Sequence, residues 1–208
     1  QDQVLDGVRP IIDHFDAIAV DEKKLIPQAH ADDIEAYWQS FTKELGSAVK
    51  TWAYTNLLPH RDIMIQPLSL DCPWYEQLFV HALYNIPKRL LWKSLNLNKP
   101  AADEALVLIK KNFNEVDELL SDGRKYLCGD RMTLADMSFS VSGAPLVVPN
   151  GYGGFQYGPS PIPDVEQFPE ELQGIIKAMR ETKAGQFILR MYAEERYARV
   201  SNGQNGAS

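Results

Sequence analysis

The stretch that decides the fold reads YLCGDRMTLADMSF and covers residues 126–139. Thr133 and Asp136 have the spacing of a capping box, in which each side chain accepts a hydrogen bond from the other residue's backbone amide. Met132 and Met137 flank this pair as a hydrophobic staple would. The residues that follow are apolar or small, which predicts a helix buried on most sides. Because a buried helix start needs internal partners for its amides, we assign Thr133 and Asp136 a structural role rather than a catalytic one.

The hydrophobic spacing is helical along most of the chain. Apolar side chains recur every three or four residues over 34–52 and again over 106–120, the period of one helix face. Residues 169–181 and 186–199 predict two further helices, which Ala184-Gly185 would separate. No alternation typical of β-strands accompanies them. The sequence therefore predicts an all-α fold, a helical bundle.

Prolines and glycines mark the expected breaks between these helices. Pro67 and Pro73 predict the two ends of a loop, and Pro73 then suits the first turn of a helix that Pro87 breaks or kinks. Ten of the 25 residues from 145 to 169 are glycine or proline, which predicts one long loop. Residues 10–18 fit a short helix after a turn.

Composition narrows the function classes. The chain has 208 residues, 45% hydrophobic residues and a net charge of −7, which fits one globular domain and argues against a nucleic-acid partner. No apolar run approaches the ~20 residues of a transmembrane helix. The two cysteines form no C-x-x-C pair and the four histidines no metal-like pairing, so we expect neither a disulfide framework nor a metal site.

The run Tyr126-Leu127-x-Gly129-Asp130-x-x-Thr133-x-Ala135-Asp136 resembles the signature of the helical C-terminal domain of glutathione transferases. In that family the capping box opens a buried helix at the centre of the domain. Residues 183–196 also resemble the last helix of a bacterial and plastid-type subgroup. The resemblance implies a remnant or linker over 1–26, a glutathione-transferase C-terminal-like domain over 27–200 and a flexible tail over 201–208.

The family's activity then suggests a function. The resemblance implies a protein that handles small hydrophobic electrophiles with glutathione, this chain supplying the hydrophobic-substrate domain. The thioredoxin-like half that activates glutathione is expected to be largely missing, since only residues 2–18 could match its last helix. The family's Glu/Gln-Ser pair, which holds the glutamyl group, reads Asp6-Gly7 here. Glutathione is therefore expected as co-substrate only if that half is present, and whether this chain is an enzyme is left open.

A substrate pocket would be walled by the first long helix and the Gly/Pro-rich loop. Aromatic and apolar side chains suit a small hydrophobic ligand. On this reasoning the candidate pocket residues are Trp38, Phe41, Tyr152 and Phe155. We name no catalytic residue and no metal ligand.

Two other functions remain open at this point. The chain could be a non-catalytic interaction or structural module of a larger assembly built on the same helical domain, or a carrier for a hydrophobic ligand. A homodimer is expected by resemblance. The free thiols suggest a reducing compartment, either the cytoplasm or an organelle interior. Because the sequence begins with Gln1, we expect any targeting peptide to be absent already.

Overall fold

Helices make up all the regular secondary structure of the described residues. The computed structural model describes residues 4–150, 152–153 and 162–196. The α-helices are α1 (Val8–Ile18), α2 (Ala31–Gln39), α3 (Gly46–Leu57), α4 (Arg61–Ser69), α5 (Trp74–Ala82), α6 (Asn85–Ser94), α7 (Lys99–Leu119), α8 (Leu134–Val147), α9 (Glu170–Glu181) and α10 (Lys183–Arg190). Short 3-10 or π segments are η1 (Asp21–Lys23), η2 (Gln28–His30), η3 (Ser40–Leu45), η4 (Leu120–Asp122), η5 (Val165–Gln167) and η6 (Met191–Glu195). The all-α prediction is confirmed for this part of the chain.

The first long helix is continuous but not uniform. Helix α2 passes into α3 through η3, a π-type segment, so the predicted helix over 34–52 is confirmed. Asp32 and Asp33 lie in its first turn, where acidic groups favour the positive end of the helix dipole. Its apolar face is buried, and α3 packs along α7. The second helix that the sequence predicts, over 106–120, corresponds to part of α7 and the start of η4.

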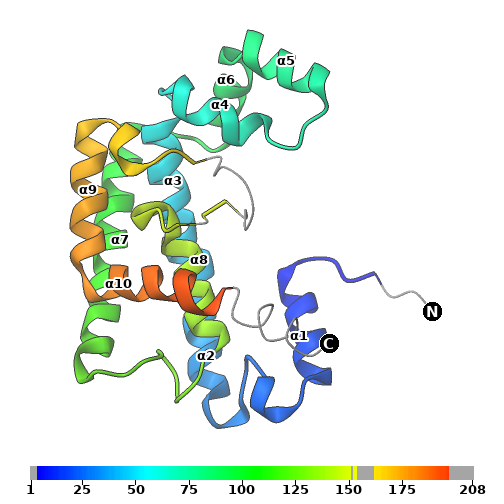
Figure 1. Ribbon diagram of the computed structural model, residues 1–208, viewed down its shortest axis with the longest axis vertical. Coiled ribbons are helices and arrows are strands. Elements are labelled where there is room, and N and C mark those ends of the chain that lie inside the picture. The colour runs from blue at the N-terminus through cyan, green and yellow to red at the C-terminus, as the bar shows by residue number, and fades with distance from the viewer. Residues whose placement is uncertain (1–3, 151, 154–161, 197–208) are drawn as a thin grey trace, which may run out of the picture.

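Helix α8 lies at the centre of the bundle (Figure 1). It contacts α2, η3 and α3 on one side and α9 and α10 on the other. The ring of Phe139, which is fully buried, lies 5.0 Å from Phe41 of η3, 5.5 Å from Phe113 of α7 and 6.2 Å from Phe187 of α10. These four rings join the main helices in one core. Aromatic pairs at such distances add to the stability that burial gives.

The predicted break at Ala184-Gly185 is wrong. The chain breaks at Thr182, whose hydroxyl accepts a hydrogen bond from the Gly185 amide at 2.9 Å and so caps α10. Gly185 lies inside the first turn of that helix. A Cβ there would be 1.9 Å from the carbonyl oxygen of Met179, so the glycine allows α10 to approach α9 rather than ending a helix. The predicted helix was to reach residue 199, and its last residues lie outside the described part.

Two prolines that predicted loop boundaries lie inside helices. Pro67 is in α4. The loop expected between Pro67 and Pro73 therefore consists of the end of α4 and the turn that follows this helix. Pro145 is in α8, so the long loop starts after Val147 rather than at 145. Both prolines lie in the last turn of their helix, where each removes one hydrogen bond to the preceding turn and only two helical residues follow. The break predicted at Pro87 is present slightly earlier, between α5 and α6.

Helices α4, α5 and α6 form a small arm at one end of the bundle (Figure 1). Its own core consists of Leu58, Met64, Tyr84 and Leu97, and the Tyr84 hydroxyl donates to the Leu58 carbonyl at 2.9 Å. No residue of α5 or α6 is buried. The arm therefore leaves much of its apolar surface uncovered in this structure.

Helix α1 contacts the bundle through polar side chains and Ile12, and it exposes most of its other apolar side chains. Arg9 pairs with Glu35 of α2 and lies 4.9 Å from the ring centre of Trp38. On the opposite side, Val8, Phe15 and Ile18 are 69%, 61% and 68% exposed. Most of the apolar side of α1 is therefore uncovered, whereas a surface helix usually turns its apolar side toward the core. The predicted tail over 201–208 lies outside the described residues.

Candidate functional site

The N-terminus of α8 is stabilised by its capping box. Asp136 is fully buried, and one carboxylate oxygen accepts from the Thr133 amide at 2.7 Å and from the Thr133 hydroxyl at 2.6 Å. The other oxygen accepts from the Leu127 amide at 2.7 Å, which ties the preceding loop to the same carboxylate. Burial raises the pKa of Asp136, and these hydrogen bonds oppose that rise. The pair fixes where α8 begins and so positions every side chain along it.

One narrow stripe of α8 is not covered by the other helices. Ten of its fourteen residues are buried, whereas Met137 and Val141, one turn apart, are exposed. Between them on the same side lies Ser140. This stripe forms the floor of a cavity.

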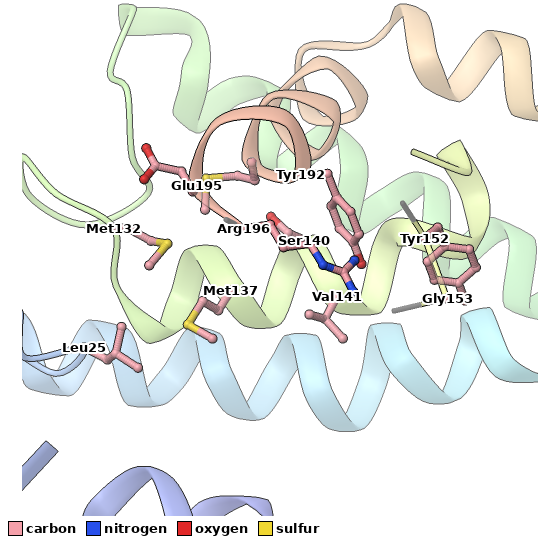
Figure 2. Close-up of a pocket in the computed structure, with 11 residues that line it drawn as sticks. Leu25, Met132, Met137, Ser140, Val141, Tyr152, Gly153, Tyr192, Glu195 and Arg196 are labelled. Atoms are coloured by element: carbon pink, nitrogen blue, oxygen red, sulfur yellow. The ribbon is translucent and has the colours of Figure 1, made fainter. Parts of the chain in front are cut away.

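The cavity above this stripe has a volume of about 580 Å³ (Figure 2). Leu25 and Met132 line one end, and Tyr152 and Gly153 line the other. The C-terminal segment supplies the wall opposite α8, through Met191, Tyr192, Glu195 and Arg196. The volume is within the range of small-molecule sites, and most of the wall is apolar. Three of the five methionines of the chain line it, and their thioethers suit contact with aromatic rings.

The charged and phenolic groups of the wall are held in neutral or paired states. Glu195 accepts a hydrogen bond from the Tyr126 hydroxyl at 2.6 Å and lies 3.6 Å from the Lys125 ammonium. Burial, with contributions from Tyr192 and Tyr54, raises the pKa of Tyr152 to about 12. Tyr152 is therefore a neutral phenol at physiological pH, suited to hydrogen bonding and not to acting as a phenolate.

A second cavity of about 340 Å³ adjoins the first. Helices α3, α4 and α8 and the segment after α8 line it, and Val141 and Tyr152 line both cavities. Its walls are also mainly apolar, and it contains Met64 of α4.

Neither Cys72 nor Cys128 is among the described residues that line the two cavities. Burial, together with the nearby Asp136 and Asp33, raises the pKa of the Cys128 thiol to about 11, so this cysteine is protonated at neutral pH. The described residues contain no cluster of three or more His, Cys, Asp or Glu side chains that could hold a metal ion. Within the same ranges, no helix has the length and apolarity needed to cross a bilayer. The arrangement is chemically suited to binding an apolar molecule.

The structure separates the four predicted pocket residues. Tyr152 lines both cavities. Phe41 is buried in the core, where its ring stacks on Tyr37 at 5.5 Å, and Trp38 packs beneath Arg9 of α1, so neither is among the residues lining the two cavities. Phe155 lies outside the described residues. Sequence reasoning missed Met132, Met137, Met191 and Ser140 as wall residues.

A signal for two of the missed residues was present in the sequence. The sequence predicts Met132 and Met137 as the hydrophobic staple around the cap, and in the structure they also form the cavity wall next to it. No sequence pattern indicates that Met191 or Ser140 lines the cavity, because their positions there depend on how η6 crosses α8.

Comparisons with known proteins agree with this architecture. A family model described as "Glutathione S-transferase, C-terminal domain" matches residues 77–141, which run from α5 to the middle of α8 and include the capping box. The search of curated proteins and the search of solved structures found no match. The match covers 65 of the 208 residues, and over this part the chain is similar to the helical C-terminal domain of glutathione transferases.

Proposed function

We propose that this chain supplies the hydrophobic-substrate domain of a glutathione-transferase-like protein that handles small hydrophobic electrophiles. The observation that carries the proposal is the apolar cavity of about 580 Å³ on the capped, central helix of a domain of this type. Its methionine walls and few polar groups favour a flat, apolar ligand.

The described residues do not fit a glutathione site. Conjugation needs a thiolate that is stable near neutral pH. The thiol of Cys128 and the phenol of Tyr152 both have raised pKa values, and Asp6 and Gly7 stand where the resemblance places the glutamyl-binding pair. We therefore derive no conjugation step from this chain. Glutathione would be the co-substrate of a thioredoxin-like domain acting together with it.

Helix α1 supports such a domain. Its exposed residues Val8, Phe15 and Ile18 share one side of the helix, opposite the side that Arg9 and Asp16 fix to the bundle. Exposed apolar patches of this kind mark an interaction surface. We propose that the thioredoxin-like domain covers this side of α1.

Turnover and binding measured on the same sample test the proposal. The purified chain is mixed with 1-chloro-2,4-dinitrobenzene, with and without glutathione, and both conjugate formation and binding are followed. We expect binding of the aromatic compound without turnover. Turnover would show that the chain activates glutathione by itself, and absence of binding would contradict the substrate-domain proposal.

A second candidate is a non-catalytic interaction module, and the arm favours it. Trp74, Leu78, Phe79 and Leu90 are all exposed on α5 and α6, Trp74 by 76%. On this alternative the arm packs against a second copy of the chain. Light scattering after size exclusion would detect a dimer that the double substitution Leu78→Ser/Phe79→Ser dissociates. The control is Val107→Ser, because Val107 is an isolated exposed residue of α7.

We propose a reducing compartment, the cytoplasm or an organelle interior, as the location. Cys72 and Cys128 are both free thiols in the structure. Free cysteines are usual in such compartments.

A further inference from the structure

Ser140 lines the larger cavity, and the protein leaves its buried hydroxyl oxygen without a partner. Ser140 is only 4% exposed, and its hydroxyl makes no hydrogen bond. Buried side-chain hydroxyls nearly always have a partner, so an exception in a native structure requires an explanation.

The neighbouring serine of the same helix shows that the helix itself could have satisfied this group. The Ser138 hydroxyl donates toward the Leu134 carbonyl at 2.8 Å and lies 3.0 Å from the Ala135 carbonyl. This is the usual solution for a serine inside a helix. Ser140 has no such bond to the turn before it.

The position of Ser140 gives the explanation. It lies on the cavity stripe of α8, with Met137 toward one end and Tyr152 toward the other (Figure 2). Its immediate neighbours on that stripe are Met137 and Val141, which offer no hydrogen bond. The hydroxyl is already buried in the free protein, so an apolar ligand would leave it without a partner, whereas a ligand whose hydroxyl or carbonyl reaches it would pair with it.

We propose that Ser140 is the specificity-determining residue of this cavity, and that the ligand class is an aromatic molecule with a single hydroxyl or carbonyl group. The aromatic part packs against Met132, Met137 and Met191, and the polar group forms a hydrogen bond with the Ser140 hydroxyl. This inference rests on the proposed function, because it requires the cavity to bind apolar molecules. Sites with a polar group dedicated to the ligand discriminate against analogues that leave it unpaired.

The test uses two ligands of nearly equal shape, 2-naphthol and 2-methylnaphthalene. Calorimetry gives the ratio of their dissociation constants for the unchanged protein, for Ser140→Ala and for Ser142→Ala. Ser142 is the control because it lies two residues further along α8 and lines the second cavity. We expect Ser140→Ala to reduce the preference for 2-naphthol by about 2- to 12-fold, the range that one neutral hydrogen bond gives. Ser142→Ala should leave the ratio unchanged.

A stability measurement on the ligand-free protein separates this role from a structural one. Because the Ser140 hydroxyl has no partner, Ser140→Ala should leave the melting temperature unchanged or raise it. A ratio that Ser140→Ala does not change would overturn the role of Ser140 alone. Failure of both naphthalenes to bind would overturn the cavity proposal and the role of Ser140 with it.

Discussion

Replacing Asp136 with alanine should destabilise the fold more than any surface substitution. The change removes the acceptor for three donors, namely the Leu127 amide, the Thr133 amide and the Thr133 hydroxyl. The hydroxyl can turn to another acceptor, but the two backbone amides stay buried and unpaired. At about 1–3 kcal/mol for each unpaired buried group, the free energy of unfolding falls by about 2–6 kcal/mol. Burial raises the pKa of Asp136, so relief from burying this carboxylate offsets part of the loss.

Thermal unfolding followed by circular dichroism measures this effect. For a domain of this length each kcal/mol corresponds to about 2–4 °C, so Asp136→Ala should lower the melting temperature by at least about 4 °C. Asp130→Ala is the matched control, since Asp130 is an exposed aspartate of the same segment and should change stability by less than about 0.5 kcal/mol. Equal melting temperatures for the two variants would refute the assignment of Asp136 as the anchor of α8.

Three further predictions follow from single contacts. Gly185→Ala should lower the free energy of unfolding by about 1–3 kcal/mol or more, because the added Cβ would clash with the backbone of α9. Gly174→Ala has open space around the added Cβ and should raise the free energy of unfolding by about 0.5–1 kcal/mol. Chemical denaturation of both variants measures the two changes. Hydrogen bonds from Arg124 lower the pKa of Asp122 to about 2, so the stabilisation by this pair is present above pH 3.8 and is lost as the pH falls through about 2. An NMR titration midpoint near 3.8 for the unchanged protein would contradict this. Arg124→Gln should move the midpoint upward but leave it below 3.8, because the backbone amide of residue 124 still donates to the carboxylate. With a pKa of about 11, the Cys128 thiol should react only slowly with iodoacetamide at pH 8 in the folded protein. Rapid alkylation of Cys128, detected by mass spectrometry, would contradict its burial.

The helices could be predicted from the sequence where local signals and tertiary packing agree. The 34–52 pattern and the Thr133–Asp136 spacing are local, since periodicity and capping act within a few residues. The errors arose where packing prevailed over local preference. Pro67 and Pro145 remain helical near helix ends, and Gly185 serves a close helix contact and not a break.

The cavity could not be predicted in the same way. Its walls come from segments far apart in sequence, so their meeting depends on how the helices cross. Aromatic residues suit apolar ligands, which makes them pocket candidates in the sequence, yet Phe41 is part of the core and Trp38 packs against α1. Residue type alone does not distinguish the inside of a bundle from the wall of a cavity. Only Tyr152 was placed at the cavity by this reasoning.

The central claim is that the cavity on α8 binds small aromatic molecules, and methionine methyl NMR tests it most directly. All five methionines would be labelled, and 2-naphthol would be added to the protein. The account predicts shifts for Met132, Met137 and Met191, which line this cavity, and none for the core residue Met179. Met64 reports on the second cavity. A spectrum in which only Met64 moves, or in which no methyl moves, would contradict the claim.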